Sequence, residues 1–380
     1  MKIEDLREEI DRTDAMLVEL FNRRMDIVKS IAEYKTENNI PIYDSERERK
    51  LFDRVATLAG EKTQAYVRTL YAVITDLSRS YQGSIIHKES GIVSKIKSAL
   101  ENTPKLFPQK ATVACQGTEG AYSQLACEKL FELPSIMYFN NWDNVFSAVE
   151  SGLCRYGILP IENSTAGTVN RIYDLMTDNN FSIVRSVKIK TSHTLLVNSG
   201  VKLSDVKEII SHEQAIQQCD NFLRELKGVK VTYCENTAVA AKTVRDSGRK
   251  DLAAISSRPC SALYGLSILP NSIQNNDVNY TRFICISKNT EIYPGANKTS
   301  FMLSVPNKPG SLYRVMSKFS ALGINLTKLE SRPIPGSEFE FLFYLDVESS
   351  VYSPALFELI NELAYGTDRF RYLGSYSEMT

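Results

Sequence analysis

The sequence predicts a multidomain protein in which an all-α region is followed by an α/β region and then by a smaller α+β region. Residues 1–88 are highly charged, contain no glycine before Gly60, and repeat apolar residues with the period of a helix. Residues 89–109 contain prolines and are predicted to be a linker with a helix in it. From 110 to 288, short apolar runs alternate with glycine turns and amphipathic stretches, which is an α/β pattern. From 298 to 376 the pattern is strand, helix, strand, strand, helix, strand.

Three helices are expected in the first region. An apolar stripe marks the first, and the stretch "NNIPIYD" ends it because its asparagines and proline interrupt helical continuity. A second helix is expected from about Ser45 and a third from about Thr63 to Ile86, with a short loop over 57–65 between them. The apolar stripe of the first helix consists of Ile3, Leu6, Ile10, Leu17, Leu20, Phe21, Ile27 or Val28, and Ile31.

Composition excludes several classes of protein. Lys+Arg and Asp+Glu both number 45, so the basic surplus typical of a nucleic-acid-binding protein is absent. The 7 cysteines form no C-x-x-C pair and there are only 3 histidines, so no zinc pattern is present. The N-terminus has no apolar signal segment and no run of 18 apolar residues occurs. We therefore expect a soluble cytoplasmic protein with free thiols and no membrane partner.

Cations on the first helix are spaced so that two of them can share one ligand. Arg24 and Lys35 are 11 residues apart, which places them within about 20° of each other around the helix and roughly 16 Å apart along it. Arg7 lies 17 residues before Arg24, about 25 Å away and about 100° around the helix. If Arg7 binds the same ligand, it must do so from a partner chain. The ordinary alternative for each of these cations is a solvated surface position.

Two later groups of polar residues complete a candidate pocket. Asp44, Arg47 and Glu48 follow the helix break, and Asp44 and Glu48 are one turn apart. Ser78 and Gln82 are also one turn apart, on the third helix. Cations, a carboxylate and neutral hydrogen-bonding groups together suit a dicarboxylate ligand that also carries a hydroxyl group.

The segments "LREEIDRTDAMLVELFNRR", "PIYDSERER" and "DLSRSYQ" resemble the AroQ-type chorismate mutases, which are intertwined all-helical dimers. The resemblance implies conversion of chorismate to prephenate, a rearrangement that needs no general base and depends on holding the dianion in a compact chair. It implies that Lys35 and Gln82 address the breaking ether oxygen and that Glu48 contacts the ring hydroxyl. The substrate-binding residues that it implies are Arg7 from the partner chain, Arg24, Asp44, Arg47 and Ser78.

Four polar clusters occur in the α/β region: "CQGTEGAYS" (115–123), "PIENSTAGTV" (160–169), "SHEQAIQQC" (211–219) and "NYTRF" (279–283). Taken singly, each is better explained by structure than by catalysis. The second cluster follows an apolar run, and Ser211 of the third lies where a helix N-cap alone would explain it. Thr281 and Arg282 stand at the start of an apolar strand, where the ordinary interpretation is a polar strand end that faces water.

In this order the four clusters resemble prephenate dehydratase, over about residues 110–288. The resemblance implies two α/β lobes built like a type II periplasmic binding protein, with the active site in the cleft between them. The reaction removes carboxylate and ring hydroxyl from prephenate, and Thr281 would donate the proton, or a strong hydrogen bond, to the departing hydroxide. No metal or organic cofactor is required. The substrate-binding residues implied are Asn163, Ser211, Gln218, Glu162 and Arg282.

Two questions about this site stay open in the sequence. Arg282 either pairs with a substrate carboxylate or turns towards an internal acid. His193 and His212 are possible acids, but the first precedes an apolar strand and the second lies near a helix start, so structural roles are favoured for both.

The segments "NKPGSLYRVM" (307–316) and "LESRP" (329–333) resemble the ACT regulatory domain of prephenate dehydratases, a ferredoxin-like module. The resemblance implies that these segments bind L-phenylalanine as an allosteric inhibitor. Gly310 would allow close backbone approach, and amides at a helix N-terminus suit a carboxylate. The alternative is a module that serves only dimerisation. The effector-binding residues implied are Gly310, Ser311, Leu312, Glu330, Ser331, Arg332 and Pro333.

The three resemblances cover nearly the whole chain and predict a bifunctional enzyme of phenylalanine biosynthesis, inhibited by phenylalanine and assembled as a homodimer or larger oligomer. One alternative keeps the dehydratase and makes the helical region a dimerisation element only. A second is a non-enzymatic, amino-acid-sensing binding protein built on the same cleft. The set Arg24, Lys35, Glu48 and Gln82 argues against the first alternative, and "TRF" argues against the second.

Overall fold

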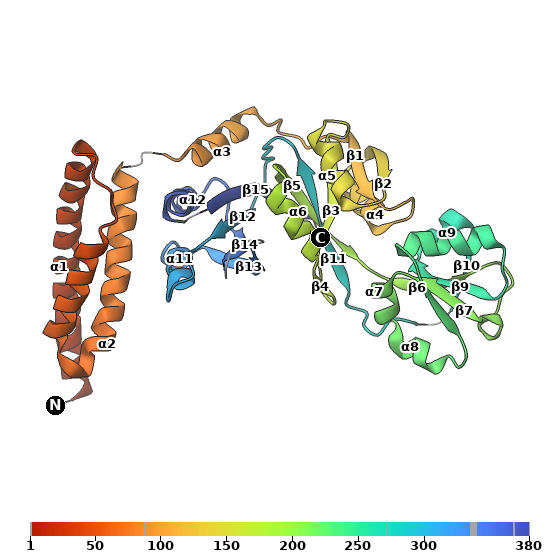
Figure 1. Cartoon of the computed structure of the whole chain (residues 1–380), viewed down its shortest axis with the longest axis horizontal. Coiled ribbons are helices and arrows are strands. Elements are labelled where there is room, and N and C mark those ends of the chain that lie inside the picture. The colour runs from red at the N-terminus through yellow and green to blue at the C-terminus, as the bar shows by residue number, and fades with distance from the viewer. Residues whose placement is uncertain (1, 87–88, 271, 335–339, 368, 380) are drawn as a thin grey trace. The chain divides into compact units, whose positions relative to one another are not determined.

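The computed structural model describes residues 2–86, 89–270, 272–334, 340–367 and 369–379. The chain divides into two compact units (Figure 1). The first unit consists of Met1–Lys97 and Phe301–Arg371, and the second of Ser98–Ser300 and Tyr372–Thr380. Among the described residues, no helix combines the length and the hydrophobicity that crossing a membrane requires.

Two long helical segments, α1 (Ile3–Glu37) and α2 (Ser45–Ile86), form the N-terminal part of the first unit, and α2 consists of two helices joined at Gly60. The predicted end of the first helix is confirmed, since Asn38 is its C-cap and Asn39 has a positive φ of 54°. The predicted second and third helices are both present, and the break expected between them over 57–65 is confined to Gly60. Gly60 has a non-helical backbone, with φ 69° and ψ 168°. A residue without a Cβ adopts this backbone at little cost, so a single glycine provides the turn where a longer loop was expected. Arg79 donates to Glu48 at 2.7 Å although 31 residues separate them, which would be about 46 Å along a straight helix. The two helices therefore run back alongside each other.

Most of the apolar stripe on α1 is exposed within one chain. Only Val28 and Ala32 of this helix are buried, whereas Ile10 is 60% exposed, Leu20 61% and Ile27 56%. Large apolar side chains in a continuous stripe are seldom left in water, so this face of α1 has the character of an interface.

The rest of the first unit follows the predicted order of strand, helix, strand, strand, helix, strand. Strands β13 and β14 are antiparallel, from Asn325 opposite Glu348 to Pro333 opposite Phe341. Helix α12 contacts α2 within this unit, where Ser80 donates a hydrogen bond to Glu362, which also pairs with Lys318 at 3.1 Å. The elements are β12 (Lys298–Ser304), α11 (Ser311–Ala321), β13 (Asn325–Pro333), β14 (Phe341–Glu348), α12 (Pro354–Gly366) and β15 (Arg369–Met379). Residues 298–300 of β12 and 372–379 of β15 belong to the second unit.

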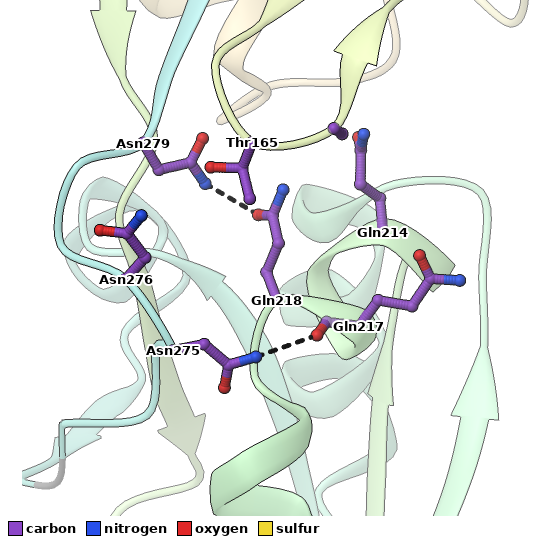
Figure 2. Close-up of a pocket in the computed structure, with 8 residues that line it drawn as sticks. Thr165, Gln214, Gln217, Gln218, Asn275, Asn276 and Asn279 are labelled. Carbon is purple, nitrogen blue, oxygen red and sulfur yellow. Dashed lines mark hydrogen bonds between the residues drawn. The ribbon is translucent and has the colours of Figure 1, made fainter.

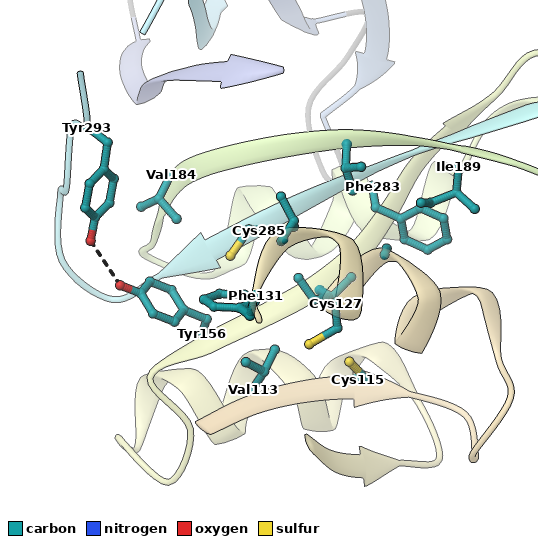
Figure 3. Packing of buried hydrophobic residues seen from close by; sticks show 14 residues of the cluster. Val113, Cys115, Cys127, Phe131, Tyr156, Val184, Ile189, Phe283, Cys285 and Tyr293 are labelled. Atoms are coloured by element: carbon teal, nitrogen blue, oxygen red, sulfur yellow. Dashed lines mark hydrogen bonds between the residues drawn. The ribbon is translucent and has the colours of Figure 1, made fainter. Parts of the chain in front are cut away.

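The first lobe of the second unit is a sheet in the order β5-β11-β3-β1-β2, in which β11 runs antiparallel to both neighbours. Its core includes Phe131, Tyr156 and Phe283, and Phe131 packs against Tyr156 with ring centres 5.3 Å apart (Figure 3). The last residues of β15, Ser377–Met379, pair in parallel with β5. The elements are α3 (Gly91–Asn102), β1 (Lys110–Gln116), α4 (Tyr122–Leu130), β2 (Leu133–Phe139), α5 (Trp142–Glu150), β3 (Tyr156–Asn163), β4 (Gly167–Thr168), α6 (Asn170–Asp178), β5 (Ser182–Lys190) and β11 (Tyr280–Ser287).

A second sheet, in the order β10-β6-β9-β7-β8, forms the other lobe with a core of its own. The chain enters this lobe after β5 and returns from it into β11, so residues 191–192 and 272–279 lie on the connections between the lobes. Polar residues on these connections therefore lie where the two lobes meet. The elements are β6 (His193–Val197), β7 (Glu208–Ser211), α7 (Glu213–Gln217), α8 (Asp220–Glu225), β8 (Lys230–Tyr233), α9 (Thr237–Ser247), β9 (Leu252–Ser257), α10 (Pro259–Tyr264) and β10 (Ser267–Leu269).

Candidate functional sites

Arg24 and Lys35 of α1 face polar groups from later in the chain. The Arg24 guanidinium donates to the hydroxyl of Ser78 on α2, and Ser78 in turn donates to the carbonyl of Ile74 at 2.6 Å. Lys35 Nζ donates to the carbonyl of Ile42 at 2.6 Å. The two cations are half-buried, and burial lowers the pKa of Arg24. The structure thus brings two residues that were predicted from the sequence, Arg24 and Ser78, into direct contact.

Gln82 lies one turn beyond Ser78 and is 7% exposed. Its Nε2 donates to the carbonyl of Ser78 at 3.2 Å. Its Oε1 has no hydrogen-bond partner among the described residues. A buried amide with one end unsatisfied is costly unless a ligand or a partner chain completes it.

Glu48 is held by a residue that sequence reasoning missed. Arg79, which follows Ser78, donates to Glu48 Oε1 at 2.7 Å and also pairs with Asp76. Its guanidinium lies 5.5 Å from the centre of the Tyr43 ring. Burial raises the pKa of Glu48, and the charge and hydrogen bond of Arg79 oppose that rise.

The remaining predicted residues of the helical site are on the surface. Asp44 accepts a hydrogen bond from the backbone N–H of Arg47 at 2.9 Å, so it caps the start of α2. Arg47 is exposed, and Arg7 is exposed near the N-terminal end of α1. A single chain therefore does not bring Arg7 to the other cations.

Thr281 lies between two polar neighbours in the second unit. Its hydroxyl is 3.0 Å from Asn163 Nδ2, which donates to it, and 2.9 Å from the hydroxyl of Thr191. Thr281 is paired with Asn163 across β11 and β3, so both side chains leave the sheet on the same face. The sequence predicted Thr281 and Asn163, whereas Thr191 was missed.

Asn163 also connects this pair to the other lobe. Its Nδ2 donates to Asn279 Oδ1 at 2.7 Å, and Asn279 Nδ2 donates to Gln218 Oε1 at 2.8 Å. Gln218 Oε1 is also 2.9 Å from His193 Nε2. Thus Gln218, predicted from the sequence, joins a network that links the two lobes.

A pocket opens beside this network and is lined mainly by amide side chains (Figure 2). The glutamines that face it come from the second lobe and the asparagines from the connection between the lobes. Asn275 Nδ2 donates to the carbonyl of Gln217 at 3.3 Å. Neutral donors and acceptors of this kind can orient a polar ligand without fixing its charge. The lining residues are Thr165, Ala166, Gln214, Gln217, Gln218, Asn275, Asn276 and Asn279.

Arg282 is turned towards an internal acid, which was the second of the two alternatives for this residue. Its Nε lies 2.7 Å from Glu378 on β15, and its Nη2 donates to the hydroxyl of Tyr376 at 2.7 Å. Adjacent side chains of a strand point to opposite faces, so Arg282 and Thr281 cannot both face the pocket. Its register partner Glu162 follows the same alternation, on the face opposite Asn163. The substrate-binding role expected for Arg282 is therefore corrected to a structural one.

Ser211 is also not presented to a ligand. It is 0% exposed, lies in β7, and donates its hydroxyl hydrogen to the carbonyl of Ile255 at 2.6 Å. The cap of α7 is His212, whose Nδ1 accepts from the backbone N–H of Gln214 at 3.2 Å. The expectation of a substrate contact at Ser211 is corrected, and the structural role for His212 is confirmed.

The predicted effector segments lie on β13 and at the start of α11. Gly310 is the N-cap of α11 with φ 79°, a left-handed conformation that favours glycine. Ser311 is 5% exposed and accepts from Arg314 at 2.9 Å, and Leu312 is half-buried. On β13, exposure alternates residue by residue: Glu330 and Arg332 are half-buried, whereas Ser331 and Pro333 are exposed.

Comparisons with known proteins match two separate segments of the chain to family models. The model of chorismate mutase type II matches residues 6–83, and that of prephenate dehydratase matches residues 113–291. The bifunctional chorismate mutase/prephenate dehydratase of Aquifex aeolicus is 30% identical over 379 residues, which cover 99% of this chain and 98% of the relative. The arogenate dehydratase/prephenate dehydratase 2 of Arabidopsis thaliana is 35% identical over 311 residues, covering 78% of this chain and 81% of the relative.

A solved structure is also similar to this chain. Prephenate dehydratase from Arthrobacter aurescens in complex with L-Phe is 27% identical, with a TM-score of 0.64, covering 70% of this chain and 89% of that one. The polar network around Thr281 lies within the segment that the dehydratase model matches, and Arg24, Ser78 and Gln82 lie within the mutase segment. The chain belongs to the family of bifunctional chorismate mutase/prephenate dehydratases.

Proposed function

We propose that the cleft around Thr281 is where prephenate loses carbon dioxide and hydroxide to give phenylpyruvate. The observation that carries this assignment is the hydrogen bond from Asn163 Nδ2 to Thr281 Oγ1 at 3.0 Å. Because Asn163 donates to the oxygen, the hydroxyl hydrogen of Thr281 is available for another acceptor. The departing ring hydroxyl of prephenate is such an acceptor, and hydrogen bonding to it lowers the barrier to its loss.

The neighbours of Thr281 make it a better donor than an isolated hydroxyl. As the Thr281 hydrogen moves to the departing oxygen, negative charge grows on Oγ1. Asn163 Nδ2 and the Thr191 hydroxyl, at 3.0 and 2.9 Å, are placed to stabilise that charge. Gln218 and the amides of the adjoining pocket would orient the substrate.

We further propose that chorismate rearranges at the helical site, with its carboxylates bound by Arg24, Arg47 and a partner chain's Arg7. Lys35 and Gln82 would address the ether oxygen and Glu48 the ring hydroxyl. Two features support a homodimer or larger oligomer: the exposed apolar stripe of α1, and a buried Gln82 amide with one end unpaired among the described residues. These assignments imply domains at 1–88, 110–288 and 298–376, with 89–109 as the linker.

L-phenylalanine is the proposed inhibitor, bound by Gly310–Leu312 and Glu330–Pro333 of a ferredoxin-like ACT domain. The complex of the Arthrobacter aurescens relative with L-Phe supports phenylalanine as the ligand of this family. An effector of this kind acts only if it binds two states of the enzyme with different affinities.

Replacing Thr281 tests the dehydratase assignment. Thr281→Ala should still form prephenate from chorismate but should lose phenylpyruvate formation by about 100-fold or more, since one transition-state hydrogen bond is removed. Thr281→Ser, which keeps the hydroxyl, should retain most of the activity. Dehydratase turnover within a few-fold of wild type in the alanine variant would exclude Thr281 from the mechanism.

A further inference from the structure

A chain of hydrogen bonds with a fixed direction runs through the cleft. It begins at the backbone N–H groups of Thr165 and Ala166, which donate to Asn163 Oδ1 at 3.0 and 2.8 Å. Backbone N–H groups can only donate, so they identify the oxygen end of the Asn163 amide. The nitrogen end therefore faces Asn279, and Nδ2 donates to Asn279 Oδ1 at 2.7 Å.

The next hydrogen bond, from Asn279 to Gln218, has its donor and acceptor in the same order. Because Asn279 Oδ1 is an acceptor, the other end of its amide is the donor, and it meets Gln218 Oε1 at 2.8 Å. The second neighbour of that oxygen is His193 Nε2 at 2.9 Å. An amide oxygen cannot donate, so His193 must carry a hydrogen on Nε2.

We propose that His193 is a positioning residue of the dehydratase site, which as the neutral Nε2–H tautomer holds the Gln218 amide with its nitrogen directed at a carboxylate of the substrate. This inference rests on the proposed function of the cleft. Figure 2 shows the Gln218 oxygen facing Asn279 and the nitrogen turned away from it. If the Gln218 amide were reversed, its NH₂ group would face the donors of Asn279 and His193. The two donors that meet at Oε1 therefore fix the orientation of this amide.

The surroundings of His193 agree with this tautomer. The side chain is 6% exposed, and its Nδ1 has no hydrogen-bond partner among the described residues. A hydrogen on that nitrogen would be a buried donor without an acceptor, which is the costlier arrangement of the two. Burial lowers the pKa of His193, although the hydrogen bond to Gln218 opposes this, so the ring is neutral at neutral pH. The Tyr122 ring stands edge-on to it at 6.4 Å and limits its rotation.

Nitrogen NMR of the wild-type protein tests the tautomer directly. The chain has only 3 histidines, so ¹⁵N-histidine labelling gives a small set of ring signals, which His193→Asn assigns by the loss of one set. At pH 7.5 the His193 signals should be those of a neutral ring with a protonated Nε2 and a bare Nδ1. A hydrogen on Nδ1, or a cationic ring at this pH, would overturn the proposal whatever the enzyme's activity.

A matched pair of variants tests the effect on the reaction. Glutamine places an NH₂ where Nε2 of histidine lies, whereas asparagine reaches only as far as Nδ1. His193→Asn should lower dehydratase kcat/KM for supplied prephenate by about tenfold or more, because Gln218 loses a partner that orients it. His193→Gln should stay within about threefold of wild type, because it keeps the donor.

Two controls separate this effect from misfolding. Mutase activity of the same protein reports on the helical region, and fluorescence of Trp142, the chain's 1 tryptophan, reports on the fold of the second unit. His212→Asn should leave dehydratase activity unchanged, because asparagine also caps helices. Wild-type kcat/KM in folded His193→Asn would refute the positioning role. A wild-type protein without dehydratase activity would instead refute the proposed function, while the NMR result would still decide the tautomer.

Discussion

Replacing Glu378 with glutamine tests whether the C-terminal strand stabilises the second unit through a buried ion cluster. Glu378 is 11% exposed and lies 2.7 Å from Arg282, 2.9 Å from Lys298 and 3.0 Å from Lys188. Glutamine keeps the size of the side chain and removes its charge, leaving these cations without their counter-ion. Breaking a buried pair by removing one partner is far more damaging than losing an exposed pair.

The magnitude follows from the pKa of Glu378. Burial acts to raise it, but Arg282, Lys298 and Lys188 outweigh burial and lower it from 4.5 to about 2. A difference of roughly 2.5 units corresponds to about 3 kcal/mol of folding stability. The folded pKa is below the unfolded one, so this stabilisation is complete above about pH 4.5 and is lost as the pH falls towards 2. At pH 3 roughly half of this stabilisation should remain.

Urea unfolding followed by Trp142 fluorescence measures this in the second unit. At pH 7, Glu378→Gln should reduce the free energy of unfolding by about 3 kcal/mol, and the difference should shrink to about half at pH 3. Asp246→Asn is the control, since Asp246 pairs with Arg245 in α9 but is 51% exposed. It should change stability by less than about 1 kcal/mol. A loss at pH 7 no larger than that of the control would refute the ion-cluster argument.

Three other predictions concern the first unit. Arg79→Met removes the cation that opposes the burial-induced rise in the Glu48 pKa, so the acid limb of the mutase pH–rate profile should move to higher pH; an unmoved limb would separate Arg79 from Glu48. Gly310→Val forces a β-branched residue into φ 79° at the start of α11, so phenylalanine inhibition should disappear while both catalytic rates persist; full inhibition would place the effector site elsewhere. Arg7→Ala and Arg24→Ala should each lose mutase activity, and co-refolding them should restore up to about a quarter of it, because half of the dimers are mixed and hold one intact pocket of two. Confirmed heterodimers without rescue would refute the shared site.

The element order could be predicted from the sequence because local periodicity determines it. The alternation after residue 298 predicted the strand, helix, strand, strand, helix, strand order that the structure shows. The break expected over 57–65 is present but is confined to Gly60, because the residues around it are compatible with a helix. A single glycine with a non-helical backbone is enough to end one helix and begin the next.

A residue of the site could be predicted from the sequence only where it lies in a recognisable motif. Thr281 and Asn163 stood in recognisable clusters, whereas Thr191 contacts Thr281 from 90 residues away with nothing in its neighbourhood to mark it. The partner of Arg282 was equally hidden, because Glu378 reaches it through pairing of the chain's last strand with β5. The prediction for Ser211 was wrong because its hydroxyl donates to a buried carbonyl. A serine that precedes a helix can make such a bond as readily as it can contact a ligand. Long-range strand pairing decides such contacts, and local patterns do not encode it.

The central claim is that one chain holds two separate active sites, and a crossed assay of two variants tests it most directly. Lys35→Ala should fail to consume chorismate yet convert supplied prephenate to phenylpyruvate at the wild-type rate. Thr281→Ala should consume chorismate and stop at prephenate. Mixed together and given chorismate, the two variants should produce phenylpyruvate, because prephenate released by one can be used by the other. Loss of both activities in either folded variant, or no phenylpyruvate from the mixture, would contradict two separate sites joined by a diffusing intermediate.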